Sequence, residues 1–260
     1  MYVFFRVDVS NKIGAGHIKR CIRIAKLFKR SKITFILSKK NEYFNFFKNS
    51  KYRIIEINNP NLDIKKDIKR TLSIINKTKS SEKKILFVDS YNLGLVWETK
   101  IKKKVDKLIA IDDLKRKHDV DLLINQNWYF KENINYFKSY NNIENLAFGP
   151  NYHLGEKKIL NNNKKIYWTL FFGGSDHYNI TLKILRLISL NKKIKICVVC
   201  LNSSKYNLEK IKNYIKQKNL KNVTLKINLE NLSKILLDTK FFIGSGGSTT
   251  WERILYRIPS

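Results

Sequence analysis

The sequence is poor in residues that break or cross-link a chain, with 3 Pro, 10 Gly and 3 Cys among 260 residues. So few Pro and Gly exclude collagen-like and low-complexity chains. Three Cys are too few for the disulfide framework of a small secreted protein, which favours a reducing compartment. No apolar run approaches the ~18 residues of a membrane span, and the first residues lack a secretory signal. We therefore expect a folded protein of the cytoplasm with no membrane partner.

Acidic residues are also scarce, since 21 Asp and Glu stand against 52 Lys and Arg, a formal net charge of +31. A basic nucleic-acid-binding protein without catalysis is one hypothesis for such a charge. It requires a contiguous basic face and a steep salt dependence of binding. The Lys residues are instead scattered among Ile and Asn along the chain, as AT-rich codon usage produces. We favour compositional drift and expect no nucleic-acid partner.

Short apolar runs alternate with amphipathic stretches, which is typical of βα units around a parallel sheet. The pattern predicts strands at residues 2–9, 32–37, 52–57, 84–89, 107–111, 121–124, 165–172, 193–201, 222–227 and 240–243. It predicts helices at residues 16–30, 179–190, 208–217, 229–237 and from 248. We predict an N-terminal Rossmann-like domain (1–150), a Gly- and Asn-rich linker (151–163) and a second domain (164–260). Because the chain stops just after Pro259, where a strand should begin, we expect the second domain to be incomplete.

Three glycine clusters follow predicted strands and precede predicted helices: Gly14-Ala15-Gly16-His17, Gly173-Gly174-Ser175-Asp176 and Gly244-Ser245-Gly246-Gly247-Ser248-Thr249. Glycine permits close backbone approach and a helix N-terminus offers free N–H groups, so each cluster suits a phosphate, although a purely steric role in the turn is the commoner one. None has the spacing of a P-loop or a complete dinucleotide fingerprint. Open α/β sheets bind ligands at the carboxyl ends of their strands, and the third cluster is the best diphosphate candidate.

Polar side chains near these turns are candidates for chemistry. Glu252 lies one turn into the last helix, where its carboxylate either binds both ribose hydroxyls or interacts only with the helix dipole. The positive helix end at His17 favours a neutral imidazole, which can accept a proton from water. Further candidates for substrate contacts, or for turn capping, end two predicted strands: Asp89, Ser90, Tyr91, Asp112 and Asp113.

Metal and redox sites are not expected. Cys197 and Cys200 form a C-x-x-C, but an offset of three within a strand turns the two thiols to opposite faces, and no second ligand pair follows. We predict both thiols in the core. The histidines at 118, 153 and 177 have no metal-ligand spacing. No metal and no other cofactor is therefore predicted.

Five motifs occur in order along essentially the whole chain: R-x-D-x-S-x-x-I-G-x-G-H-I-x-R from Arg6 to Arg20, D-x-Y at Asp89 and Tyr91, IDD at 111–113, GG-[ST]-D at 173–176 and GSGGSTTWE at 244–252. Together they resemble the UDP-2,4-diacetamido-2,4,6-trideoxy-beta-L-altropyranose hydrolase family of pseudaminic acid biosynthesis. The spore-coat polysaccharide proteins and, more distantly, the peptidoglycan GlcNAc transferase are related to that family.

The resemblance implies a GT-B fold, two Rossmann-like domains facing across a cleft, in a monomer. It implies hydrolysis of the UDP-sugar at its anomeric carbon, without a metal and with inversion. His17 matches the catalytic histidine, which activates water. The diphosphate is expected on Ser245, Ser248 and Thr249, and the ribose on Glu252. The other implied substrate contacts are Gly14, Gly16, Arg20, Asp89, Tyr91, Gly173, Gly174, Ser175, Gly246 and Gly247. A GT-B transferase that passes the sugar to an acceptor stays an alternative, because it would share the UDP site.

Overall fold

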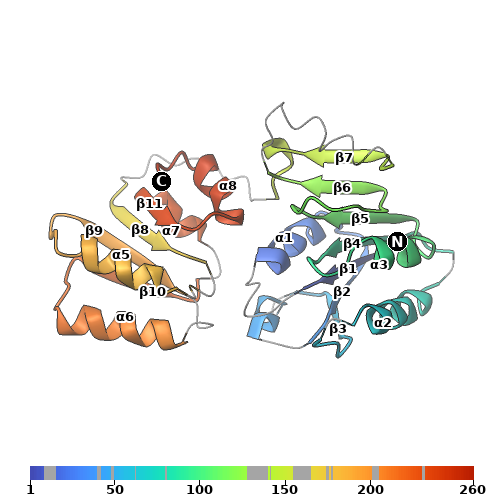
Figure 1. Ribbon diagram of the computed structural model, residues 1–260, viewed down its shortest axis with the longest axis horizontal. Helices are drawn as coiled ribbons and strands as arrows, with labels where there is room; N and C mark the ends of the chain where they lie inside the picture. Colours follow the sequence, from blue (N-terminus) through green and yellow to red (C-terminus); the bar gives the residue numbers. More distant parts are fainter. Residues whose placement is uncertain are drawn as a thin grey trace. The chain divides into compact units, whose positions relative to one another are not determined.

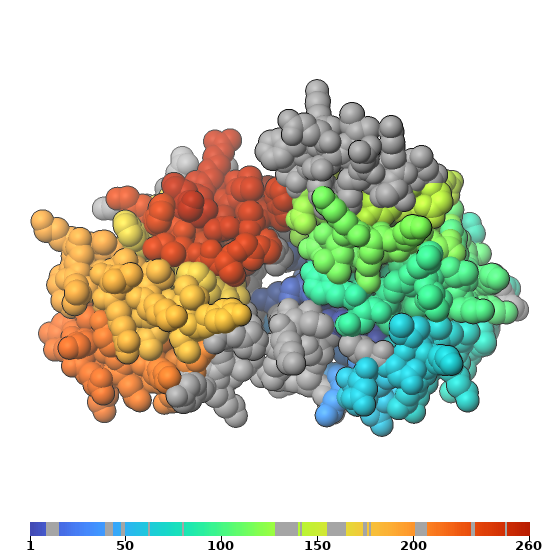
Figure 2. All heavy atoms as spheres, in the orientation of Figure 1, coloured from blue at the N-terminus to red at the C-terminus, as the bar shows by residue number. Residues whose placement is uncertain are grey.

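The computed structural model describes residues 1–8, 16–39, 42–47, 50–61, 63–79, 81–127, 140, 142–154, 165–173, 176, 178–200, 205–229 and 232–260. The chain divides into two compact units, Met1–Leu154 and Gly155–Ser260. In the space-filling view, blue to yellow-green spheres belong to the first unit and orange to red spheres to the second (Figure 2). Residues 155–163 of the expected linker lie outside the described residues, as do four glycine-cluster positions: Gly14, Ala15, Gly174 and Ser175.

The first unit contains a seven-stranded parallel sheet in the order β3-β2-β1-β4-β5-β6-β7 (Figure 1). Its strands are β1 Tyr2–Val7, β2 Lys32–Leu37, β3 Arg53–Glu56, β4 Lys84–Asp89, β5 Lys107–Ile111, β6 Leu122–Asn125 and β7 Asn145–Phe148. Its helices are α1 Gly16–Ala25, α2 Ile64–Asn76 and α3 Leu95–Lys102, with 3-10 turns η1 Glu42–Phe47 and η3 Pro150–Tyr152. Side chains alternate along each strand. Val3 and Phe5 therefore pack with α1 on one face of the sheet, and Phe4 packs with α2 and α3 on the other.

The second unit contains a four-stranded parallel sheet in the order β10-β9-β8-β11. Its strands are β8 Tyr167–Phe171, β9 Lys195–Cys200, β10 Val223–Ile227 and β11 Thr239–Gly244. Its helices are α5 Ile180–Ile188, α6 Lys205–Gln217, α7 Ser233–Leu237 and α8 Ser248–Leu255. The core clusters place α5 and α6 on one face and α7 on the other (Figure 1). The predicted α/β class with parallel sheets is thus confirmed, and none of the described helices is long and apolar enough to cross a membrane.

The two cysteines of the C-x-x-C are both buried in β9 and lie in different core clusters. Cys200 packs with α5 and α6, whereas Cys197 packs with α7. The prediction that the two thiols face opposite sides of the strand is confirmed. Burial raises the pKa of Cys197 to about 11 and that of Cys200 to about 12, so both stay as thiols near neutral pH.

Each sheet has a point at which the order of strand addition reverses. In the first unit the chain adds β2 and β3 on one side of β1, and then returns to place β4 on the other side. In the second unit it adds β9 and β10 on one side of β8 and returns to place β11 on the other. Ligands of open α/β sheets bind outside the carboxyl ends of strands at such switch points. Most candidate residues of the sequence lie at the ends of these four strands, β1, β4, β8 and β11, or directly after them, and two more, Asp112 and Asp113, follow β5.

Candidate active site

A buried ion pair holds the candidate catalytic histidine at the β1–β4 switch point. His17, the second residue of α1, is 5% exposed, and its Nδ1 lies 2.5 Å from Oδ1 of Asp89, the last residue of β4. Arg20 lies one helical turn later on the same face. It donates from Nε to Oδ2 and from Nη2 to Oδ1 of Asp89, each at 2.5 Å. The parallel register, which pairs Val7 with Asp89, brings this carboxylate to the start of α1.

Asp89 and Arg20 keep each other charged. Burial alone would raise the pKa of Asp89, but the charge of Arg20 and the hydrogen bonds from Arg20 and His17 outweigh it, so the pKa is lowered. Burial alone would lower the pKa of Arg20, but the charge and hydrogen bonds of Asp89 outweigh it, so the pKa is raised. Asp89 therefore stays a carboxylate and Arg20 a guanidinium, and the carboxylate that orients His17 already has its counter-ion.

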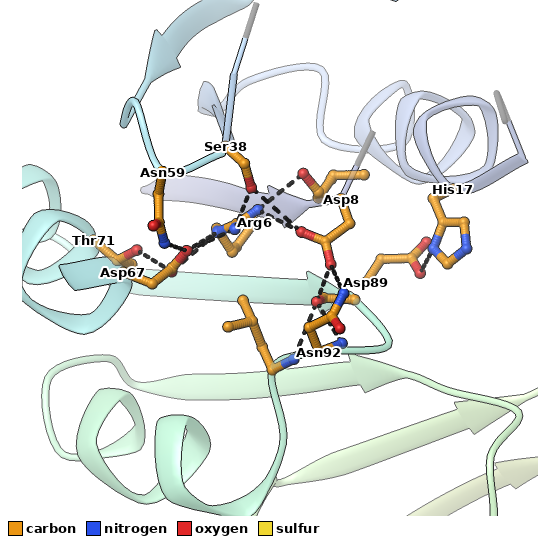
Figure 3. A network of polar contacts seen from close by, with 12 residues as sticks. Arg6, Asp8, His17, Ser38, Asn59, Asp67, Thr71, Asp89 and Asn92 are labelled. Carbon is orange, nitrogen blue, oxygen red and sulfur yellow. Dashed lines mark hydrogen bonds and ion pairs between the residues drawn. The ribbon is translucent and has the colours of Figure 1, made fainter. Parts of the chain in front are cut away.

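The contact with Asp89 determines which nitrogen of His17 can do chemistry. A carboxylate accepts hydrogen bonds, so Nδ1 carries the proton of a neutral His17 ring, and Nε2 holds the lone pair. Figure 3 shows Nδ1 directed at Asp89 and the other ring nitrogen directed away from it. A histidine held in this way can remove a proton from a water molecule at Nε2 while the carboxylate stabilises the resulting imidazolium.

The loop after β4 places Tyr91 against the same histidine. The two rings meet edge to face, with centroids 4.8 Å apart and planes at 89°. The Tyr91 hydroxyl lies 3.5 Å from Oδ2 of Asp113, which follows β5. Burial, together with the nearby charge of Asp113, raises the pKa of Tyr91 to about 12, so it is a neutral phenol at physiological pH. Tyr91 thus fixes one edge of the imidazole and retains a partly exposed surface for a ligand.

A second buried network holds the strand ends beside this site (Figure 3). Arg6 in β1 is fully buried and donates to Oδ2 of Asp67 at 2.6 Å and to Oδ1 of Asp8 at 3.2 Å. Asp8 also accepts from the Ser90 hydroxyl and, at 3.3 Å, from Asn92 in the loop after β4. These groups satisfy one another inside the unit. Arg6 and Asp8, which begin the N-terminal motif, are therefore supports of the fold.

A third buried network supports the loop after β5. His118 lies with Nδ1 2.8 Å from Oε1 of Glu98 in α3 and with Nε2 3.2 Å from Oδ2 of Asp112. Burial alone would lower the pKa of His118, but its hydrogen bonds to Asp112 and Glu98 raise it to about 9. Arg116 donates to Asp112 and, at 2.7 Å, to the carbonyl oxygen of Tyr91. The network therefore connects α3 to the loop that carries Tyr91.

The β8–β11 switch point of the second unit consists of glycines and hydroxyls. A Cβ added to Gly173, whose φ is 80°, would lie 3.7 Å from the Ser245 hydroxyl, so the turns after β8 and β11 are neighbours. Gly244 is required by packing, because a Cβ there would overlap the carbonyl oxygen of Phe171 in β8. Gly247 has a φ of 122°, which glycine adopts without strain, and directly precedes α8.

The predicted diphosphate site lies at the start of α8. The helix begins at Ser248, of which only the backbone is described, and Thr249 follows in the first turn. Free N–H groups and the partial positive charge at such an end favour a phosphate. Glu252 lies one turn further along and is 8% exposed.

The predicted site residues thus fall into two groups. The first unit holds Gly16, His17, Arg20, Asp89 and Tyr91, and the second holds Gly173, Ser245, Gly246, Gly247, Ser248, Thr249 and Glu252. The sequence predicts Asp89 as a substrate contact; in the structure its side chain is fully buried and contacts His17 and Arg20. Within the described ranges, no group of three or more His, Cys, Asp or Glu side chains is placed to hold a metal ion.

A small hollow lies beside Arg20, at the carboxyl ends of β5 and β6. Its lining includes Asp113, which follows β5, and Asn125 and Gln126, which end and follow β6. The sequence names Arg20, Asp112 and Asp113 of this lining as candidate contacts, but it does not identify the residues from β6. The signal that could have indicated these residues is a pair of polar side chains, Asn125 and Gln126, where the buried strand β6 ends.

Comparison with known proteins places this arrangement in context. The chain is 28% identical over 267 residues to the UDP-2,4-diacetamido-2,4,6-trideoxy-beta-L-altropyranose hydrolase of Campylobacter jejuni, an alignment that covers 99% of this chain and 89% of that protein. It is 24% identical to an uncharacterized protein of Methanocaldococcus jannaschii, MJ1062, and the alignment covers 100% of this chain but 54% of that protein. No protein-family model matches the chain.

Solved structures share its fold at low sequence identity. UDP-N-acetylglucosamine 2-epimerase from Rickettsia bellii superposes with a TM-score of 0.61 at 13% identity, over 100% of this chain and 78% of that one. Anabaena HepE in complex with UDP and glucose superposes with a TM-score of 0.60 at 10% identity, over 100% and 79% of the two chains. The resemblance predicted from the motifs is confirmed: the chain is a relative of the UDP-2,4-diacetamido-2,4,6-trideoxy-beta-L-altropyranose hydrolase and has the fold of the GT-B enzymes.

Proposed function

We propose that this protein hydrolyses a UDP-linked 2,4-diacetamido-2,4,6-trideoxy sugar, releasing UDP and the free sugar. The observation that carries the proposal is the His17–Asp89–Arg20 arrangement at the first switch point, in a chain related along its whole length to a hydrolase of that substrate. The fold supports use of a UDP-sugar, since HepE has the same fold and is in complex with UDP and glucose.

The reaction needs a base and a stabilised leaving group. His17 removes a proton from water at Nε2 while the water oxygen forms a bond to the anomeric carbon. The bond from that carbon to the oxygen of the β-phosphate breaks, and its electron pair leaves with UDP. Asp89 stabilises the imidazolium, which then gives its proton to solvent. Because the water attacks from the face opposite UDP, this single displacement inverts the anomeric configuration.

The UDP is assigned to the second unit. The N–H groups at the start of α8 and the hydroxyls of Ser245, Ser248 and Thr249 would take the negative charge on the diphosphate as it leaves. Glu252 would accept hydrogen bonds from the two ribose hydroxyls. This set of donors stabilises the leaving group directly, so we expect turnover to continue in the presence of a chelator.

The test is UDP release from UDP-2,4-diacetamido-2,4,6-trideoxy-beta-L-altropyranose in ¹⁸O-labelled water, without an acceptor and with EDTA. We expect release by the wild-type protein, the label on the anomeric carbon of the sugar, and a loss of kcat of roughly 10²- to 10⁴-fold in His17→Ala. Equal unfolding temperatures would show that the variant is folded. UDP release that requires an added acceptor glycan would replace the hydrolase with a GT-B transferase, and label in the phosphate of UDP would contradict attack at the sugar.

A further inference from the structure

The loop that carries Tyr91 is held by a guanidinium to which the proposed function gives no role. Arg116, in the turn after β5, donates from Nη1 to the carbonyl oxygen of Tyr91 at 2.7 Å and from Nη2 to that of Ser90 at 2.6 Å. Its Nε donates to the carboxylate of Asp112. Among the described residues, the bond from Arg116 is the one hydrogen bond that the Tyr91 backbone makes. The position of Tyr91 therefore depends on Arg116.

Arg116 is itself firmly held. Asp112, its partner, also accepts from the backbone N–H of Leu114 at 2.7 Å, which closes the turn that carries Arg116. On its other side Asp112 lies 3.2 Å from Nε2 of His118, whose Nδ1 contacts Glu98. With a pKa of about 9, His118 is a cation at neutral pH, so two cations and two carboxylates balance in this cluster. This compensation favours a supporting role for Arg116 over the binding of a phosphate.

The residue before Tyr91 is held from two directions. The carbonyl oxygen of Ser90 accepts from Arg116, and its hydroxyl donates to Asp8. The same hydroxyl accepts the backbone N–H of Asn92 at 3.1 Å. The contact with Asp8 ties the loop to β1, whereas Arg116 is the support that reaches Tyr91 itself.

The His17 ring needs more than one contact to have a defined plane. The contact between Nδ1 and Asp89 fixes one atom, but the last torsion of a histidine is broad, so the ring can still tilt about that contact. The Tyr91 ring meets the imidazole edge to face, with planes at 89°, and so restricts the tilt. The direction of Nε2 depends on the plane of the ring, and proton transfer requires that Nε2 reach the water.

We propose that Arg116 is a positioning residue for the hydrolysis, which acts through Tyr91 to keep the His17 ring in the orientation of a base. The inference rests on the proposed function. The two hydrogen bonds from Arg116 to the loop set where the Tyr91 ring meets His17. Loss of the guanidinium should therefore lower kcat more than it raises KM, and it should matter only while Tyr91 is present.

The first test is a double-mutant cycle between Arg116 and Tyr91, with UDP release from the diacetamido donor as the assay. Arg116→Gln removes the charge and the fork of donors. Arg116→Lys keeps the charge, but a single ammonium cannot reproduce the planar fork that holds both carbonyl oxygens. The matched control is Arg70→Gln, because Arg70 donates to the backbone carbonyl oxygens of Ile57 and Asn58, just after the edge strand β3.

We expect Arg116→Gln to lower kcat roughly 10- to 100-fold, the effect of a slightly misplaced catalytic group, and to change KM less than about 3-fold. In a Tyr91→Leu background the same change should lower kcat by less than a further factor of about 3. Arg116→Lys should give a smaller loss, and it decides the cycle if Arg116→Gln is unfolded. Arg70→Gln should keep the wild-type kcat. An equal loss with and without Tyr91, or no loss at all, overturns the positioning role and leaves the hydrolase in place.

The second test observes His17 directly and needs no substrate. The chain has 4 His, so a ¹³C-histidine label gives few ring signals in an NMR spectrum, and the His17 signal is the one that disappears in His17→Ala. Arg116→Gln should move this signal toward its position in Tyr91→Leu, and Arg70→Gln should leave it in place. An unmoved signal in Arg116→Gln overturns the proposal. If the signal moves but the wild-type protein releases no UDP from the donor, the proposed function fails, and the catalytic role of Arg116 fails with it.

Discussion

The two switch points have the same topology and opposite chemistry. At β1–β4 of the first unit the side chains are ionic and buried: Asp89 has no exposed surface, and Arg20 and His17 are 7% and 5% exposed. At β8–β11 of the second unit the chain uses Gly173, Ser245 and the start of α8, where the backbone itself is the functional group. In both units the sheet determines only the position of the site, at the carboxyl ends of two neighbouring strands.

The difference shows what each place is suited to do. A buried ion pair fixes the orientation of a titratable group, which is what proton transfer requires. A glycine-rich turn before a helix brings several N–H groups to one point, which is what a diphosphate requires. Under the proposed function the chemical step belongs to the first unit and nucleotide binding to the second. Changes in the first unit should then alter kcat, and changes in the second should alter the affinity for UDP.

The largest effect is expected from Asp89→Asn. This change removes the counter-ion of buried Arg20, and the new amide can present an N–H₂ donor to Nδ1 of His17, which favours the other tautomer. The kcat should therefore fall roughly 10³- to 10⁴-fold, as for other histidines that lose an orienting carboxylate. The dissociation constant of UDP, measured by calorimetry, should change less than about 3-fold. Stability should fall by about 3–5 kcal/mol, so the assays belong below the unfolding midpoint of the variant.

The matched control for this change is Asp106→Asn. Asp106 is a carboxylate at the amino end of the same sheet, where it accepts from the backbone N–H of Lys84 at 2.7 Å. The Asp106→Asn variant should keep the wild-type kcat. If Asp89→Asn lowers both kcat and the affinity for UDP to a similar extent, the assignment of chemistry to one unit and nucleotide binding to the other is wrong.

Gly244→Ala should break the second switch point without touching the first. The new methyl group would overlap the carbonyl oxygen of Phe171 and the ring of Phe242, so β11 must move away from β8. We expect a loss of about 3 kcal/mol in the free energy of unfolding, measured in urea, and a higher KM. Gly246→Ala is the control for stability, since a Cβ at Gly246 meets nothing within 4 Å. Equal stability of the two variants would contradict the packing argument at Gly244.

The smallest effect concerns the His118 network of the first unit. The pKa of His118 is about 9 in the folded protein and ordinarily 6.5, so the folded state binds its proton more tightly. The stabilisation is complete below pH 6.5 and is lost as the pH rises through 9, with an upper limit of about 3 kcal/mol at 1.36 kcal/mol per pKa unit. The free energy of unfolding of the wild-type protein should fall relative to that of His118→Gln between pH 6 and 9.5. Parallel curves for the two proteins would contradict the charged pair.

Much of the fold could be predicted because its strands are apolar runs between polar segments. The strands at Lys32–Leu37, Lys84–Asp89 and Lys107–Ile111 have the predicted bounds. The sequence did not indicate β7, Asn145–Phe148, because it is short and two of its four residues are exposed. The first helix was predicted to reach residue 30 because the apolar pattern continues beyond Ala25. In the structure it ends at Ala25, and Leu27 is 79% exposed in the turn before β2.

The site could be predicted in part. His17 and the glycine turns are local signals, visible as a residue type beside a strand end. The partnership of His17 with Asp89, 72 residues later, depends on the register of β1 on β4 and on the rotation of α1, which no local pattern contains. The contact of Arg116 with the Tyr91 loop likewise depends on the pairing of β5 with β4.

The Arg6 network also lies early in the order of synthesis. The side-chain acceptors of Arg6 in the described structure, Asp8, Ser38 and Asp67, all lie within the first 67 residues. The chain is synthesised from its N-terminus, so all three acceptors of Arg6 are made before Asp89, the acceptor of His17. The partners that support the fold thus precede, in order of synthesis, the carboxylate that contacts the candidate catalytic histidine.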